Sequence, residues 1–284
     1  MNANVGVVHL QADTLRVIRA DDANAQQMAV EVWRHRRLLY FLVWRAVKVR
    51  YKQTAIGAAW AVLQPGALAL VFAVIFGRLA GFPSDGLPRP VFFLTTLLPW
   101  TYFSAALTGA TGSLADNQHL ITKVYFPRVL LPMAAVLIPL VDMAIAAVLL
   151  GAALAVYGIP LAATTWLVPF VIAHAVVVAF AAGLWLSAAN AYFRDVRHAV
   201  PFVMQLLMFA SPVVYPASLV PEAWRTLYAL NPMVGVIEAF RWCLVGTSTW
   251  PPVSVAVSAV VTLGLLAGGL AFFQRVEGTL ADVL

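Results

Sequence analysis

The sequence is poor in charged residues and in cysteine, and both shortages exclude functions. Only 11% of its 284 residues are charged, whereas 62% are hydrophobic. This balance differs from that of a soluble globular domain and indicates an integral membrane protein. The single cysteine, Cys243, can form no internal disulfide and has no second thiol with which to hold a metal or carry out redox chemistry.

Two further sequence signals are missing, a phosphate-binding loop and a signal peptide. The chain has no GxxxxGK[ST] phosphate loop, so ATP and Mg²⁺ would have to be handled by another polypeptide. Residues 1–30 lack the basic start, compact apolar core and cleavage site of a signal peptide. The net charge of +6 is carried beside apolar runs, which favours anionic lipid headgroups over nucleic acid as the partner.

Long apolar runs divide most of the chain into segments of membrane-spanning length. Six transmembrane helices are predicted, at residues 55–77, 91–114, 129–158, 166–190, 199–216 and 253–273. The fifth is short and is interrupted by Pro212 and Pro216. We therefore expect an all-α integral membrane protein.

The polar segments complete this domain organisation. Residues 1–54 form an N-terminal region, 55–273 the six-span membrane domain and 274–284 a short tail. Residues 217–248 are too polar to span a bilayer and too apolar for a free loop. They are predicted to form two short helices at one membrane face.

Lysine and arginine are distributed unevenly between the two faces of this arrangement. Nine of the 18 precede the first span, and six spans would place 14 of them on the face that holds both termini. The positive-inside rule puts that face in the cytoplasm.

An amphipathic helix is predicted just before the first span, in "LLYFLVWRAVKVRYKQT". At a helical spacing Arg45, Lys48 and Lys52 form a basic stripe beside Tyr40 and Trp44. Such a helix would lie in the headgroup layer. It could anchor the topology, or its basic stripe could meet an anionic lipid-linked substrate.

A second amphipathic segment, "NQHLITKVYFPR" at residues 117–128, separates the second and third spans. Leu120, Ile121, Val124 and Tyr125 share one face of a helix that Pro127 would end. By amphipathicity alone this segment could be a plain connector at the cytoplasmic face.

Here the chain resembles a known family. The stretch "LLPWTYFSAALTGATGSLADNQHLITKVYFPRVLLPMAAV" resembles the permease subunits of ABC-2 type exporters of lipid-linked polysaccharides and polyol phosphates. The resemblance extends to "RYKQTAIGAAWAVLQP", "LSAANAYFRDVRHAVPFVMQ" and "FASPVVYPASLVPEAWRTLYALNPMVGVIEAFRW". It implies a homodimer in the bacterial inner membrane that works with two copies of a cytoplasmic ABC ATPase.

The resemblance also implies roles for particular residues. Residues 117–128 would be the coupling helix that docks on the ATPase, through Leu120, Ile121, Lys123, Val124, Tyr125, Phe126 and Arg128. The helix before the first span would be the interface helix, and substrate would enter beside Lys52, Gln53, Gly57 and Trp60. Residues 217–248 would hold the outer gate helices.

Aromatic residues near the expected outer face allow two interpretations. Trp100, Tyr102 and Phe103 could belong to an interfacial aromatic belt. The resemblance instead suggests that they line a translocation channel and stack on sugar rings.

Ionisable residues inside or near the spans are few. Asp142, with His174 as a possible counterpart, is expected to make a structural contact between helices, although substrate or proton handling is the alternative. Glu238 and Arg241 are three residues apart and could form a local pair in a re-entrant helix.

Three functions are compatible with these features. The first is a permease subunit that exports a polyprenyl-diphosphate-linked, O-antigen-like polysaccharide. The second is an ABC-2 permease for teichoic acid, capsular polymer or a small hydrophobic drug. The third is a membrane-embedded glycosyl- or acyltransferase. Such an enzyme needs converging acids or a His–Asp pair, and the sequence does not supply them, because its candidates are scattered: Asp142, His174, Asp195 and Glu238.

Overall fold

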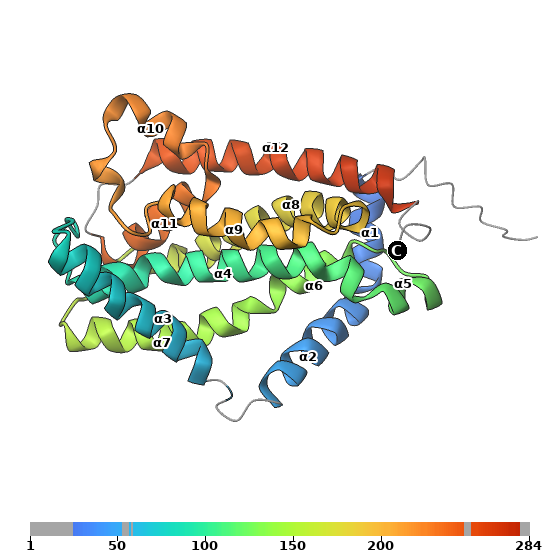
Figure 1. Cartoon of the computed structure of the whole chain (residues 1–284), viewed down its shortest axis with the longest axis horizontal. Helices are drawn as coiled ribbons and strands as arrows, with labels where there is room; N and C mark the ends of the chain where they lie inside the picture. Colours follow the sequence, from blue (N-terminus) through green and yellow to red (C-terminus); the bar gives the residue numbers. More distant parts are fainter. Residues whose placement is uncertain (1–24, 53–56, 58, 247–250, 279–284) are drawn as a thin grey trace, which may run out of the picture.

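The chain folds as an elongated bundle of helices in a computed structural model that describes residues 25–52, 57, 59–246 and 251–278 (Figure 1). All regular structure in this described part is helical. The helices are α1 (Ala25–Arg34), α2 (Arg36–Lys52), α3 (Ala59–Phe72), the π-helix η2 (Ala73–Leu79), α4 (Arg89–Asp116), α5 (Gln118–Lys123), α6 (Leu130–Leu137), α7 (Pro139–Val156), the short 3₁₀-helix η3 (Thr165–Leu167), α8 (Val168–Tyr192), α9 (Val196–Phe209), the 3₁₀-helix η4 (Ala217–Leu219), α10 (Glu222–Ala229), α11 (Pro232–Val245) and α12 (Pro252–Glu277).

Within the described residues, five helical stretches are long and apolar enough to cross a membrane. They are Ala59–Leu79, Arg89–Asp116, Leu130–Val156, Thr165–Tyr192 and Pro252–Glu277. They confirm five of the six predicted spans, and the chain is a multi-pass membrane protein. The first predicted span began at residue 55, and residues 55 and 56 lie outside the described residues.

The remaining predicted span, residues 199–216, differs from the expectation. Its helix α9 has only 14 residues, about 21 Å at the α-helical rise, whereas a bilayer core is about 30 Å thick. After it the chain turns at residues 210–216, where Pro212 and Pro216 can donate no backbone hydrogen bond. Thr96 donates to the carbonyl of Val213 at 3.1 Å, and Asn231 donates to that of Ala210 at 3.3 Å. These side chains let a non-helical segment remain buried.

Helix α4 lies at the centre of the bundle (Figure 1). In its most apolar window 78% of the residues are buried, compared with 17% in the spans of α3 and of α12. Helix α8 packs closely against α4 through small residues. A Cβ atom added at Gly183 of α8 would lie only 2.8 Å from the Cβ of Ala110 on α4. The outward faces of α3 and α12 remain apolar, as lipid contact requires.

The two ends of the bundle differ in what they carry. Helices α1 and α5 and the C-terminal end of α12 lie at one end, which we call the α5 end (Figure 1). Helices α10 and α11 lie toward the opposite end, the α10 end, within residues 217–248, where two short helices were predicted, and most residues of α11 are buried. Residues 247–248 of that prediction, and residues 279–284 of the predicted tail, lie outside the described residues.

Candidate functional site

The segment at residues 117–128 is helical only in its first half. Helix α5 has six residues and ends at Lys123, and Val124 is already extended, with ψ of 131°. The predicted helix up to Pro127 is therefore too long. A β-branched residue, an aromatic pair and the restriction that Pro127 places on Phe126 all favour extended backbone here.

The apolar side chains of this segment point in two directions. Ile121 and Phe126 are 8% and 5% exposed and pack into a cluster with Leu114, Leu130 and Phe273. Val124 and Tyr125 are 53% and 83% exposed; Lys123 is also exposed, and Leu120 is half-buried. The single apolar face expected from the helical wheel is thus divided between the bundle and the surface.

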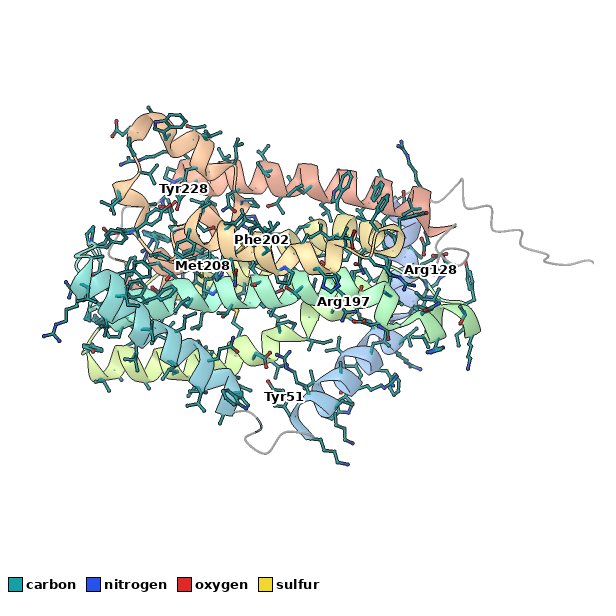
Figure 2. The ribbon with its side chains drawn as sticks, viewed as in Figure 1. Tyr51, Arg128, Arg197, Phe202, Met208 and Tyr228 are labelled. Atoms are coloured by element: carbon teal, nitrogen blue, oxygen red, sulfur yellow. The ribbon has the colours of Figure 1, made fainter. Side chains whose placement is uncertain are left out.

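Arg128 fastens the end of this segment to α12 (Figure 2). Its backbone N–H donates to Oε1 of Glu277 at 2.9 Å, and its guanidinium donates to the carbonyl of Glu277. The sequence reasoning missed Glu277, because the two residues are 149 positions apart and no local pattern relates them. A displacement of the segment would therefore act on α12 as well as on α4 and α6.

The carboxylate of Asp142 is held from the end of α2. A guanidinium nitrogen of Arg50 lies 2.9 Å from Oδ2, and the hydroxyl of Tyr51 donates to Oδ1. Burial, together with this hydrogen bond to the carboxylate, raises the pKa of Tyr51 to about 12. The prediction that His174 is the counterpart of Asp142 was wrong. The Nε2 atom of His174 instead lies 3.1 Å from the hydroxyl of Thr262 on α12.

A polar cavity of about 250 Å³ lies between α2, α3, α4 and α7 (Figure 2 labels Tyr51 beside it). Gly57 and Trp60, two of the four residues predicted to border substrate access, line it. Lys52 is exposed at the end of α2, and Gln53 lies outside the described residues. Asp142, which the sequence singled out as an acid within a span, also lines the cavity, whereas Arg50, Tyr51, Gln64 and Thr101 were not predicted as parts of a site.

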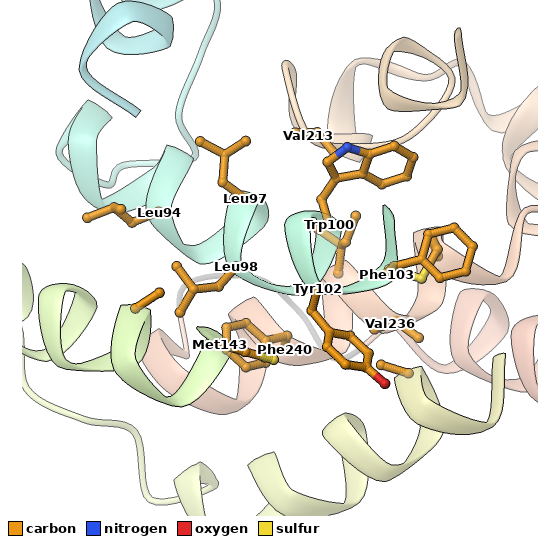
Figure 3. Close-up of a cluster of buried hydrophobic side chains, with 14 of the residues drawn as sticks. Leu94, Leu97, Leu98, Trp100, Tyr102, Phe103, Met143, Val213, Val236 and Phe240 are labelled. Atoms are coloured by element: carbon orange, nitrogen blue, oxygen red, sulfur yellow. The ribbon is translucent and has the colours of Figure 1, made fainter. Parts of the chain in front are cut away.

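The three aromatics predicted as a channel lining lie inside the helical bundle (Figure 3). Trp100, Tyr102 and Phe103 are 4%, 2% and 5% exposed and belong to the main hydrophobic core. Tyr102 also borders the polar cavity and donates to the carbonyl of Val136 at 3.2 Å. In this conformation the other two side chains contribute to packing.

A second polar region lies at the α10 end, where Glu238 and Arg241 on α11 face one cavity. The pair expected between these two side chains is not formed. The ion pairs found within the described residues are those of Arg50 with Asp142, Arg197 with Asp116, and Arg225 with Glu222. Instead the guanidinium of Arg241 lies 4.7 Å above the ring of Phe92.

Comparison with known proteins gives this arrangement a family. Residues 37–245 match the family model of the ABC-2 type transporter. The chain is 32% identical over 217 residues to the O-antigen export system permease protein RfbA of Myxococcus xanthus, covering 74% of this chain and 81% of that protein.

Two other relatives are more distant. A Klebsiella pneumoniae protein with the same name is 26% identical over 249 residues, covering 87% of this chain and 95% of its own. The polysialic acid transport protein KpsM of Escherichia coli is 24% identical over 240 residues, covering 82% and 91%. These matches agree with the apolar helical bundle and show a transport subunit: the chain is a membrane permease subunit that belongs to the ABC-2 type transporter family.

Proposed function

We propose that this chain is the membrane permease of an ABC exporter that moves a polyprenyl-diphosphate-linked, O-antigen-like polysaccharide across the bacterial cytoplasmic membrane. Relatives named for O-antigen export and for polysialic acid transport support a polysaccharide as cargo. Two copies of the chain would work with two copies of a cytoplasmic ATPase, which would supply the ATP and Mg²⁺ chemistry.

The observation that carries the proposal is the cavity between α2, α3, α4 and α7. Arg50 in its wall is half exposed and has guanidinium N–H groups to spare for a diphosphate. Exposed apolar side chains continue along α3, among them Leu63 and Leu70. A lipid-linked diphosphate could thus meet Arg50, Lys52, Gln53, Gly57 and Trp60 with its headgroup while its hydrocarbon chain stays in the bilayer.

The α5 end is proposed to face the cytoplasm and the ATPase. Lys123, Val124 and Tyr125 line a hollow of about 220 Å³ and would form the docking surface together with Leu120. Ile121 and Phe126 would anchor the segment in the bundle, so that it moves as one body with its neighbours. Arg128 would pass that displacement to α12 through Glu277.

The glycan would then pass along α4. Tyr102 already borders the cavity, whereas Trp100 and Phe103 would reach a channel only after the helices around α4 move apart. Aromatic rings are suitable for a sliding polymer because they present flat apolar faces to sugars without fixing them by many hydrogen bonds.

A double substitution, Val124→Asp with Tyr125→Asp, tests the coupling role. Purified permease, its ATPase and a lipid-linked glycan are reconstituted into proteoliposomes, and both ATP hydrolysis and glycan export are measured. We expect export to fall by about tenfold or more, because two charges would be buried in an apolar contact. Tyr157→Asp, at a half-exposed tyrosine beyond α7, serves as the control. Export at the wild-type rate by the double variant would sink the proposed docking role.

The same vesicles distinguish the cargo. Lipid-linked O-antigen, capsular polymer and teichoic acid are supplied in turn, together with a small hydrophobic drug. We expect transport of lipid-linked polysaccharide only in the presence of the ATPase and ATP. Preference for the drug would overturn the proposed substrate class while leaving the family assignment intact.

A further inference from the structure

A cavity of about 430 Å³ opens at the α10 end, between α10, α11, the start of α12 and the loop before α4. We call it the α10 chamber (Figure 2 labels Tyr228 in its wall). Its volume lies within the range of about 300–1,000 Å³ that is typical of small-molecule sites. The polar lining residues include Asp85, Arg225, Tyr228, Glu238, Arg241 and Ser254.

Arg241 is the most deeply buried charge in the chamber wall. The residue is 3% exposed, and its Nε and Nη1 atoms are buried without a hydrogen-bond partner within the described residues. Phe92 covers one face of the guanidinium but accepts no conventional hydrogen bond from its edge. Buried donors that are left unpaired cost free energy, so the site needs an acceptor that the described residues do not supply.

Glu238, one turn earlier on α11, has a buried acceptor atom that lacks a donor within the described residues. Its Oε2 atom is also buried without a hydrogen-bond partner, while the carboxylate is hydrogen-bonded to Ser254 on α12. No ion pair joins Glu238 to Arg241 across the described structure. Donors and an acceptor therefore face the same space instead of each other.

The local backbone holds these two groups in place. Asn231 caps the start of α11 by accepting from the N–H of Met233 at 3.1 Å, and Gly246 ends it in the left-handed conformation, with φ of 61°. Gly235 lets α11 lie directly on α12, because a Cβ atom there would be 2.6 Å from the carbonyl oxygen of Ser254. The chamber is thus preorganised by packing on one side and by caps at both ends of α11.

The chemistry of the wall selects the class of ligand. A guanidinium only donates hydrogen bonds and a carboxylate only accepts them, whereas a hydroxyl group does both. Two neighbouring hydroxyls of a sugar could accept from Arg241 and donate to Glu238 at once. Arg225 and Arg241 are balanced by Asp85 and Glu238, so the charges favour neither an anion nor a cation.

We propose that the α10 chamber binds an uncharged sugar residue of the transported polymer through Arg241 and Glu238. This inference rests on the proposed function, because the polymer is assumed to be a glycan. The chamber would hold one sugar at the end of the bundle where the polymer leaves and would hinder its return.

The test uses the purified permease–ATPase complex and three probes, the methyl α-glycosides of glucose, galactose and mannose. Binding is titrated by saturation-transfer NMR, with cyclohexanol as a probe that has a single hydroxyl. Glu238→Gln and Arg241→Lys alter the chamber. Glu222→Gln is the matched control, since that carboxylate is 90% exposed on α10 and is not part of the chamber lining.

We expect saturable binding of at least one glycoside and none of cyclohexanol. Glu238→Gln should weaken binding by about tenfold, because a hydrogen bond to a charged group is lost, and Glu222→Gln should leave it unchanged. If Arg241→Lys fails to assemble, Glu238→Gln decides alone. Absence of binding, or equal binding by Glu238→Gln, would mean that the chamber holds water only.

Export by the same preparation separates the two proposals. A complex that exports lipid-linked glycan but binds no glycoside in the chamber refutes this inference alone. A complex that binds glycoside through Glu238 but exports no lipid-linked glycan supports the sugar site and refutes the proposed cargo.

Discussion

Asp142 shows how a carboxylate is accommodated in an otherwise apolar helix. Arg50 and Tyr51 both reach it from α2, which fastens α2 to the span that contains α7. Because Arg50 is half exposed, the ion pair itself contributes only about 0–1 kcal/mol. The hydrogen bond from Tyr51 adds about 1 kcal/mol. The contact therefore positions α2 more than it stabilises the bundle, and substrate could displace it.

Alkaline pH tests the contribution of Tyr51. The pKa of its phenol is raised from 10.0 to about 12 by burial and by the bond to Asp142. A group whose pKa is higher in the folded chain stabilises the fold fully below its unfolded value and loses that effect as pH rises through the folded value. We expect the unfolding temperature of the wild type to fall more between pH 10.0 and about 12 than that of Tyr51→Phe.

Thermal unfolding in detergent measures this difference. Tyr40→Phe is the control, because the Tyr40 ring is 69% exposed on the same helix and should retain the wild-type fall. If Tyr51→Phe and the wild type lose the same stability over this pH range, the phenol does not hold α2 to α7.

The contact between α11 and α12 illustrates how one element positions a site. The chamber residues Glu238 and Arg241 lie on α11, and its distance from α12 is set by Gly235. The cap at Asn231 and the left-handed Gly246 fix where α11 begins and ends. Small residues at such crossings let helix backbones approach closely in the membrane.

Gly235→Ala should separate these two helices. The new methyl group would lie 2.6 Å from the Ser254 oxygen and from the Ser258 side chain, and overpacking of this kind costs about 1–3 kcal/mol. Gly264→Ala on α12 is the control, since nothing lies within 4 Å of its added Cβ, and it should be neutral or stabilising by up to about 1 kcal/mol. Chemical denaturation in micelles compares them, and equal midpoints would contradict the close contact.

The two ends of the molecule carry separate polar sites. The α5 end carries the segment fastened by Arg128 to Glu277 and the Arg197–Asp116 ion pair at 2.8 Å. The α10 end carries the chamber. The proposed function makes use of this separation, because the ATPase and the point of release would lie on opposite sides of the bilayer.

Cysteine labelling tests the proposed orientation of the two ends. The only native cysteine, Cys243, is 1% exposed and should not react with a membrane-impermeant maleimide. Thr122→Cys, exposed on α5, should react only in inside-out vesicles. Thr226→Cys, exposed on α10, should react only in right-side-out vesicles. The reverse pattern would invert the topology and place the chamber in the cytoplasm.

The sequence could predict those features that depend on the solvent. Runs of apolar residues locate the long spans because a bilayer leaves backbone groups no partner outside a helix. The shortening of α9 was only partly visible, through Pro212 and Pro216, because the turn after it depends on Thr96 and Asn231 elsewhere in the chain. Nothing in the sequence indicated that Ile121 would be buried and Tyr125 exposed. A helical wheel shows which residues share a face of one helix but not which other helices pack against it.

By itself, the sequence determined that this is a multi-pass helical protein, that the amphipathic segment at residues 117–128 lies between two spans, and that the chain resembles an export permease. Only the tertiary structure decided which groups meet: Asp142 with Arg50, Arg128 with Glu277, and Arg241 with an open space beside Glu238. The physical reason is that hydropathy is a property of each segment in its solvent. A polar contact across the bundle instead depends on where distant helices pack against one another.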